Sequence, residues 1–316
     1  MTAAAVPRHP ARSAPLRALV PFGLPAIPGV QPVVWAGGPL PSAQVLAQVR
    51  VHVLPYTFDP ASFAAIAHLP ALRVLQTLTA GYEHVLAHLP PGVTLCNAGG
   101  VHDDSTAELA LALLLAAQRG LPDFVRAQQR HEWAHAAYPS LADRRVLVVG
   151  HGGVGRAVAA RLAPFGCEVT VVARTAREGV RAVADLPVLL GRADVVVLAV
   201  PLTEQTRGLV DARFLAALPA GALLVNVSRG PVVDTAALVA ELRSGRLRAA
   251  LDVTDPEPLP PGHPLWDCPG LLLSPHVAGN SSAFGPRARR LVVDQLSRLA
   301  AGDPPLHVVV LPTLQA

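Results

Sequence analysis

The chain lacks lysine entirely, since all 26 of its basic residues are arginine. The compositional bias of a GC-rich genome accounts for this absence, but the absence still has a chemical consequence. A Walker A phosphate loop, a Schiff-base nucleophile and a Tyr-x-x-x-Lys dehydrogenase site all need an amine side chain. The sequence therefore excludes these three kinds of site.

Cysteine is scarce as well. Cys96, Cys167 and Cys268 are odd in number and far apart in the sequence. This spacing indicates neither a disulfide framework nor a Cys-x-x-Cys metal or redox site. We expect three buried thiols and no bound metal.

Long hydrophobic runs and aromatic residues are also few. The chain is 51% hydrophobic, yet its longest strongly apolar run covers only residues 109–117, well short of the roughly 20 residues that a membrane-spanning helix needs. Residues 1–28 place prolines and arginines around short apolar pieces, unlike a secretory signal peptide. A net charge of +4 without a basic block, with 4% aromatics, argues against a nucleic-acid partner. We expect a cytoplasmic protein, away from membranes, with a frayed and disordered segment at 1–28.

Short β-rich runs alternate with helical spacing in two successive series along the chain. In the second series the apolar runs are continuous, as in strands that helices cover on both faces. The sequence predicts an α/β protein of two Rossmann-like domains with doubly wound parallel sheets, one flavodoxin-like and one dinucleotide-binding, and an active-site cleft between them. The run at 307–311 is expected to rejoin the first sheet. The substrate domain would then be discontinuous, 1–100 with 284–316, and the dinucleotide-binding domain would cover 101–283.

A helix that is apolar nearly all round is predicted after residue 104. Ser105 and Glu108 have the spacing of a capping box at its start. A helix of this kind must be covered by other protein surface. Either the two domains pack together over it or a second subunit does, and we expect a homodimer.

Three glycines, Gly150, Gly152 and Gly155, have G-x-G-x-x-G spacing between an apolar strand and an amphipathic helix. The spacing alone is a weak signal, but this context is typical of a dinucleotide site. The first glycine allows the turn, the second lets the backbone approach a pyrophosphate, and the third lets the helix pack on the strand. We therefore predict a bound dinucleotide.

The next strand ends where an acidic residue would meet a free ribose 2′-hydroxyl. Ala173 and Arg174 stand there instead, with Arg177 close by. An arginine fork suits a 2′-phosphate, so NADP(H) is predicted in preference to NAD(H). The alternative is that Arg174 is an ordinary surface residue of an arginine-rich chain.

A histidine, His276, closes the apolar run at 271–276. A lone histidine on an apolar element is more often a packed ring than a catalyst. Its partners elsewhere in the chain decide between the two interpretations.

From about residue 45 to its end, the sequence resembles the D-isomer-specific 2-hydroxyacid dehydrogenases, in particular glyoxylate/hydroxypyruvate reductase-like members. The resemblance rests on the glycine motif and on motifs in matching order and spacing. These are "LTAGYEHV" at 78, "NAGGVHDDSTAELALALLLAAQR" at 97, "VPLTEQTRGLV" at 200, "VNVSRGPVVDTAAL" at 225, "ALDVTDPEPLPPGHPLW" at 250 and "LLLSPHVAG" at 271.

The resemblance implies a role for each polar residue that follows a late strand. Arg229 would bind the substrate carboxylate and polarise the adjacent carbonyl, a task that suits a permanently charged fork. Glu257 would orient His276 and stabilise its protonated form, and His276 would act as the acid/base. Asp252 would hold the nicotinamide carboxamide. The alternatives are a salt-bridging arginine, a solvated loop carboxylate and a buried capping carboxylate.

The resemblance also implies a wider set of contacts. The backbone N–H groups of Thr79, Ala80 and Gly81 would meet the substrate, together with Arg229 and His276; an ordinary turn is the alternative. The expected cofactor contacts are Thr106, Gly150, Gly152, Gly153, Val154, Gly155, Arg174, Thr175, Val200, Pro201, Thr206, Val227 and Asp252.

The expected function is NADP(H)-dependent hydride transfer between the nicotinamide and a small 2-oxo or D-2-hydroxy acid, with NAD(H) as the second choice of cofactor. Two alternatives stay open. The fold could serve a cofactor-sensing binding protein, or the same donors could bind a phosphonate or phosphite as the substrate of a dehydrogenase.

Overall fold

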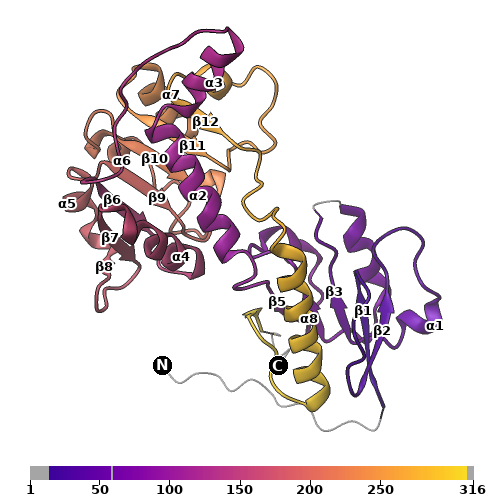
Figure 1. Cartoon of the computed structure of the whole chain (residues 1–316). Coiled ribbons are helices and arrows are strands. Elements are labelled where there is room, and N and C mark those ends of the chain that lie inside the picture. Colours follow the sequence, from indigo (N-terminus) through magenta and orange to yellow (C-terminus); the bar gives the residue numbers. More distant parts are fainter. Residues whose placement is uncertain (1–13, 58–59, 312–316) are drawn as a thin grey trace. The chain divides into compact units, whose positions relative to one another are not determined.

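The computed structural model describes residues 14–57 and 60–311 (Figure 1). The chain forms two compact units. One comprises the described parts of 1–102 and 282–316, and the other is the continuous segment 103–281.

The first unit is built on a six-stranded sheet in the order β13-β5-β4-β3-β1-β2. Every strand pair is parallel except β13 with β5, which is antiparallel. The expectation that the C-terminal run rejoins this sheet is therefore confirmed. The strands are β1 (Leu16–Val20), β2 (Val30–Val34), β3 (Val51–Val53), β4 (Val74–Gln76), β5 (Thr94–Cys96) and β13 (Val308–Val310). The helical segments are α1 (Ala43–Leu46), η1 (Pro60–His68), η2 (Glu83–His88) and α8 (Phe284–Ala301).

The expected disorder at 1–28 is wrong for residues 14–28. Strand β1 lies inside this stretch, pairs with both β2 and β3, and buries four of its five side chains. Its remaining side chain, Arg17, donates to Gln31 Oε1 (2.8 Å) at the sheet surface. The prolines and arginines in this stretch interrupt the apolar pattern of a short strand, which is stabilised by its burial in the sheet. Residues 1–13 lie outside the described residues.

The second unit is a seven-stranded, fully parallel sheet in the order β12-β11-β10-β9-β6-β7-β8. The chain winds outward from β6 in both directions, so the strand order reverses between β6 and β9. In open α/β sheets ligands bind at the carboxyl ends of the strands at such a reversal. The strands are β6 (Arg145–Val149), β7 (Glu168–Ala173), β8 (Arg181–Ala182), β9 (Val195–Leu198), β10 (Leu223–Asn226), β11 (Arg248–Leu251) and β12 (Leu271–Leu273).

Helices cover both faces of this second sheet (Figure 1). Side chains of α2 and α4 share one buried cluster with Val146 and Val148, whereas α5, α6 and α7 share the other with Leu147 and Val149. The predicted doubly wound α/β architecture is confirmed. The helical segments are α2 (Asp103–Gln118), α3 (Leu121–Gln129), α4 (Gly153–Leu162), η3 (Ala163–Phe165), η4 (Val183–Asp185), α5 (Leu186–Leu190), α6 (Ala212–Ala217), η5 (Gly230–Val232), α7 (Thr235–Arg243) and η6 (Pro264–Asp267).

The predicted capping box at Ser105 is wrong. Helix α2 begins at Asp103, so Ser105 lies inside its first turn and its Oγ contacts Ser281 Oγ (2.6 Å). Much of the apolar surface of α2 packs on α4 and the sheet of its own unit. This packing removes the main reason for inferring a second subunit from that helix.

Candidate active site

The glycine turn joins β6 to α4 at the strand reversal. Gly150 has a φ of +115°, and a Cβ there would lie 2.3 Å from the carbonyl oxygen of Ala199, at the end of the neighbouring β9. A Cβ on Gly155 would lie 2.0 Å from the carbonyl oxygen of Gly150. Glycine is therefore required at both positions by packing alone.

Gly152 differs from these two glycines. Its φ of −75° is open to any residue, and a Cβ there would meet nothing within 4 Å. It is the N-cap of α4 and, being glycine, supplies no side-chain cap to this helix. The amides of Gly153 and Val154 lie in the first turn next to the open space at Gly152, whereas a Cβ on Gly153 would lie 1.8 Å from Asp103 Oδ2. This arrangement fits the pyrophosphate of a dinucleotide.

Basic side chains gather beyond the end of β7. Arg174 and Thr175 are exposed, and within the described chain Arg174 has no acidic partner. Arg177 donates from one terminal nitrogen to His151 Nδ1 (2.5 Å) and to the His151 carbonyl (3.3 Å), which ties it to the glycine turn. Burial, and the charges of Arg177 and Arg156, lower the pKa of His151, which favours the neutral ring that this acceptor role requires. This contact was not predictable from the sequence motif.

The segment after β9 carries Val200, Pro201 and Thr206. The Thr206 hydroxyl donates to the carbonyl of Pro201 (2.6 Å) and accepts from the amide of Thr203 (2.8 Å). Thr206 therefore closes the loop that begins at Val200. Its hydroxyl shapes this loop in the structure, a role that the sequence motif did not suggest.

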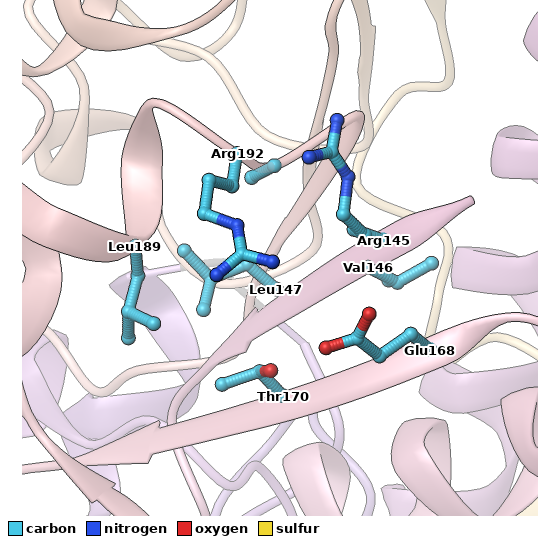
Figure 2. A pocket seen from close by; sticks show the side chains of 8 residues that line it. Arg145, Val146, Leu147, Glu168, Thr170, Leu189 and Arg192 are labelled. Carbon is cyan, nitrogen blue, oxygen red and sulfur yellow. The ribbon is translucent and has the colours of Figure 1, made fainter.

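A small cavity of about 60 Å³ lies at the opposite edge of this sheet (Figure 2). Arg145 and Glu168, the first residues of β6 and β7, line it with Arg192. Arg145 is paired there with Asp194 (3.1 Å), which lowers the pKa of the Asp194 carboxyl. The cavity is too small for a nucleotide and lies away from the carboxyl ends of the strands.

The carboxyl end of β10 presents Val227 and Arg229. Val227 is buried, and Arg229 is half-buried with its NH1 donating to the carbonyl of Ser228 (2.7 Å). Asn226 braces this turn, because its Oδ1 accepts from Ser228 and its Nδ2 donates to the carbonyl of Arg229 (3.1 Å). Asn226 was not predicted as a site residue, although its place at the end of a buried strand was a usable signal.

Asp252 follows β11 and is buried, with 1% of its surface exposed. Its Oδ1 accepts from Ser274 Oγ (2.6 Å) and from the Val277 amide (3.0 Å), and its Oδ2 accepts from the Ala278 amide (3.0 Å). Its carboxylate therefore clamps the segment that follows β12. Such contacts are those of a capping carboxylate, and the expected contact of Asp252 with the cofactor stays a prediction.

His276 lies within that clamped segment. Its φ is +52°, and its amide donates to the carbonyl of Asp252 (2.7 Å). Its Nδ1 is hydrogen-bonded to Glu257 Oε1, with both side chains partly exposed. The structure thus brings His276 and Glu257 into direct contact from two separate loops. A ring held in this way by a carboxylate is typical of an oriented acid/base.

Arg229, Glu257 and His276 follow β10, β11 and β12, which are consecutive parallel strands. All three residues therefore stand at the carboxyl edge of one sheet, the same edge that carries the glycine turn. Thr106 lies in the first turn of α2, where it is buried.

The loop at residues 79–81 belongs to the first unit and follows β4. Thr79 is half-buried, Ala80 exposed and Gly81 buried. Within the described chain their three amides have no acceptor, so the loop offers donors to an anion. Among the residues at 14–57 and 60–311, no cluster of three or more histidine, cysteine or acidic side chains could hold a metal.

Comparisons with known proteins show which family the chain resembles over most of its length. A family model described as D-isomer specific 2-hydroxyacid dehydrogenase, NAD binding domain, matches residues 111–278. A glyoxylate reductase of Korarchaeum cryptofilum is 34% identical over 266 residues, which are 79% of this chain and 80% of that protein.

Two solved structures are similar over nearly the whole chain. A D-isomer specific 2-hydroxyacid dehydrogenase from Xanthobacter autotrophicus, in complex with NADPH and MES, has a TM-score of 0.77 at 32% identity and covers 94% of this chain and 98% of its own. An NADPH-dependent glyoxylate/hydroxypyruvate reductase from Sinorhizobium meliloti, with NADP and sulfate, has a TM-score of 0.77 at 28% identity and covers 93% of this chain and 98% of its own.

A parallel-sheet dinucleotide fold with a histidine–carboxylate pair at its carboxyl edge defines a nicotinamide-dependent oxidoreductase. This chain belongs to the D-isomer specific 2-hydroxyacid dehydrogenase family. It is accordingly an oxidoreductase acting on CH–OH groups with NAD(P).

Proposed function

We propose that the protein reduces a small 2-oxo acid, such as glyoxylate or hydroxypyruvate, reversibly to the D-2-hydroxy acid, with NADPH preferred. The contact between His276 Nδ1 and Glu257 is the observation that carries this proposal. It supplies an oriented acid in the same unit as the glycine turn. The names of the relatives support the substrate class.

The chain's own residues have distinct tasks in this reaction. With Nδ1 engaged by Glu257, Nε2 of His276 is the atom that gives a proton to the carbonyl oxygen in reduction and takes one back in oxidation. Arg229 binds the carboxylate of the substrate and withdraws charge from the adjacent carbonyl. Asp252 keeps His276 in place through the backbone contacts of the clamped segment. When bound, the nicotinamide supplies the hydride, which no side chain can provide.

The residues present fit a bound dinucleotide. Gly152, Gly153 and Val154 would hold the pyrophosphate at the start of α4, where the space beside Gly152 is open. Gly150 and Gly155 shape this turn, and the expected contacts also include Thr106, Thr175, Val200, Pro201, Thr206, Val227 and Asp252. The preference for NADPH rests on Arg174, an exposed guanidinium without an acidic partner in the described chain, supported by NADP(H) in both similar structures.

A homodimer and a cytoplasmic location complete the proposal. Support for the dimer comes from apolar side chains in and just after α3, where Leu121, Val125 and Trp133 are 49%, 54% and 97% exposed. Light scattering coupled to size-exclusion chromatography gives the oligomeric state directly. The location is supported by Cys96, Cys167 and Cys268, which are all free thiols. Cys96 and Cys268 are buried as expected, but Cys167 is only half-buried. No helix in the described part of the chain is long and apolar enough to cross a membrane.

The function is tested by following NADPH and NADH oxidation with glyoxylate, hydroxypyruvate, pyruvate, longer 2-oxo acids and phosphonate analogues. We expect turnover of small oxo acids with a higher kcat/KM for NADPH. Tight NADPH binding without turnover would instead favour the cofactor-sensing protein. Turnover restricted to the phosphonate or phosphite class would favour the second alternative.

A further inference from the structure

In and before the loop at 79–81, the backbone carbonyls are hydrogen-bonded within the protein, whereas the amides of the loop are not. Each carbonyl of residues 77–81 accepts a hydrogen bond from within the first unit. Side-chain nitrogens supply three of the donors: Gln76 Nε2 to Thr77 O (2.8 Å), His102 Nε2 to Leu78 O (2.8 Å) and Asn97 Nδ2 to Ala80 O (2.6 Å). The carbonyl of Thr79 accepts from Thr77 Oγ1 (2.9 Å) and from the Ala98 amide (2.9 Å). The carbonyl of Gly81 accepts from Thr79 Oγ1 (2.6 Å). Because the amides of 79–81 find no acceptor in the described chain, the loop presents only donors to a ligand.

Asn97 is the side chain that fixes the middle of this loop. It follows β5, and its Nδ2 donates to the carbonyl of Ala80 at 2.6 Å. Its Oδ1 accepts from the amide of Gly99 (3.2 Å), which orients the side-chain amide. Both ends of this side chain are therefore used, and the orientation of the Ala80 peptide depends on it.

A buried pair of amides stands behind Asn97. Gln76 on β4 and Gln295 on α8 both have 0% of their surface exposed, and Gln295 Nε2 donates to Gln76 Oε1 (2.7 Å). Gln76 Nε2 then donates to the carbonyls of Thr77 (2.8 Å) and Asn97 (2.9 Å), which are the backbone positions that lead into the loop and carry Asn97 itself.

Gln295, the member of the pair on α8, also has all of its side-chain polar atoms hydrogen-bonded. Gln295 Oε1 accepts from the amide of Leu306 (2.7 Å), and Gln295 Nε2 donates to the Leu306 carbonyl (3.2 Å). The pair thus connects α8 and the segment before β13 to the base of the loop. Two buried side-chain amides are costly unless every polar atom is paired, and here each is paired. A purely packing role would be served as well by two apolar side chains of similar size.

We propose that Asn97, Gln76 and Gln295 are positioning residues that hold the amides of 79–81 in the orientation that binds the substrate carboxylate. This inference rests on the proposed function, because it assigns the carboxylate of a 2-oxo acid as the anion that the loop receives. The three residues act on the substrate through the loop backbone and do not themselves take part in proton or hydride transfer.

Two variants test the inference in the full-length enzyme. Asn97→Ala removes the donor to the Ala80 carbonyl, and Gln295→Met removes the buried amide link while keeping a side chain of similar length. Gln48→Ala is the matched control, since Gln48 Nε2 also donates to a backbone carbonyl, that of Gln44 (3.3 Å), but on the exposed surface of the same unit. The measurements are kcat, the KM for glyoxylate, the KM for NADPH and the melting temperature.

We expect Asn97→Ala to raise the KM for glyoxylate about tenfold or more. Without Asn97 the peptide of Ala80 is no longer held, and a loop amide would lose its hydrogen bond to the charged carboxylate of the substrate. Gln295→Met should raise it in the same direction by a smaller factor. The KM for NADPH should stay unchanged in both, because the glycine turn and Arg174 belong to the other unit. Gln48→Ala should leave all four measurements as in the wild type.

A lowered melting temperature with an unchanged KM for glyoxylate in both variants would overturn the inference, because it shows a role in folding only. A rise in both KM values together would overturn it too, since it shows a general loss of active structure. If the wild type turns over none of the oxo acids, the proposed function fails and this inference fails with it. That result differs from the other two, in which the wild type is active.

Discussion

Gly152→Ala should separate cofactor binding from folding. A methyl group at this position meets nothing within 4 Å, and the φ of −75° and ψ of −164° of the backbone are open to alanine. The substitution also lowers the entropy of the unfolded chain, so the free energy of unfolding should stay level or rise by up to about 1 kcal/mol. The same methyl group projects into the open space at the start of α4, where we expect the pyrophosphate.

The loss of cofactor affinity can be worked from the donors at that turn. If the methyl group displaces the pyrophosphate, one or two hydrogen bonds from backbone amides to this charged group are lost, each worth roughly 1.5–3 kcal/mol. The Kd for NADPH should therefore rise at least about tenfold, because each 1.4 kcal/mol is a factor of ten. Titration of NADPH by calorimetry gives the Kd, and thermal denaturation without cofactor gives the stability.

Gly155→Ala is the control with the opposite pattern. Its methyl group would lie 2.0 Å from the carbonyl oxygen of Gly150, so the turn must shift and stability must fall without cofactor. A Gly152→Ala protein that binds NADPH as tightly as the wild type would refute the placement of the pyrophosphate. A Gly152→Ala protein as unstable as Gly155→Ala would refute the geometry of the turn.

Three further predictions concern other parts of the chain. Arg174→Ala should lower kcat/KM for NADPH about tenfold to a hundredfold and leave that for NADH unchanged, because only the 2′-phosphate loses its fork; equal losses with both cofactors would contradict the assignment. Asp252→Asn replaces one accepting oxygen by an NH₂ donor that faces a backbone or hydroxyl donor, so we expect the free energy of unfolding to fall by about 2 kcal/mol and kcat to fall with it; denaturant titration and steady-state assays check both. Burial lowers the pKa of His52 from 6.5 to about 4, and its Nε2 is buried with no partner in the described chain. As the pH falls, the unfolded state therefore takes up a proton before the folded state does. The free energy of unfolding should be highest above pH 6.5 and decline by about 3 kcal/mol toward pH 4. In His52→Leu this decline should be smaller, and an unchanged decline would show that His52 is not its cause.

The second sheet was predictable because its strands are buried on both faces and so appear as continuous apolar runs. Strand β1 was not, because Arg17 and nearby prolines interrupt its pattern, and its stability comes from pairing with β2 and β3 on both sides. Local sequence does not show such pairing partners. The start of α2 was misplaced for a similar reason, since Ser105 meets Ser281, a residue far along the chain.

At the active site, residue types were predictable but several roles were not. His276, Glu257 and Arg229 could be named because each follows a predicted strand in a family-like motif. That Asp252 clamps the segment carrying His276 depends on donors 22 to 26 residues later, whose positions only the folded chain defines. The bracing by Asn226 depends likewise on the shape of a turn.

The central claim is that His276 is the acid/base of a 2-oxo acid reductase, and a paired measurement on His276→Asn tests it most directly. NADPH affinity and the rate of NADPH oxidation with glyoxylate are measured on the wild type and the variant at the same pH. We predict unchanged NADPH affinity and a rate lowered about 10²- to 10⁴-fold, the usual contribution of a positioned acid. A variant that binds NADPH normally and reduces glyoxylate at the wild-type rate would contradict the account.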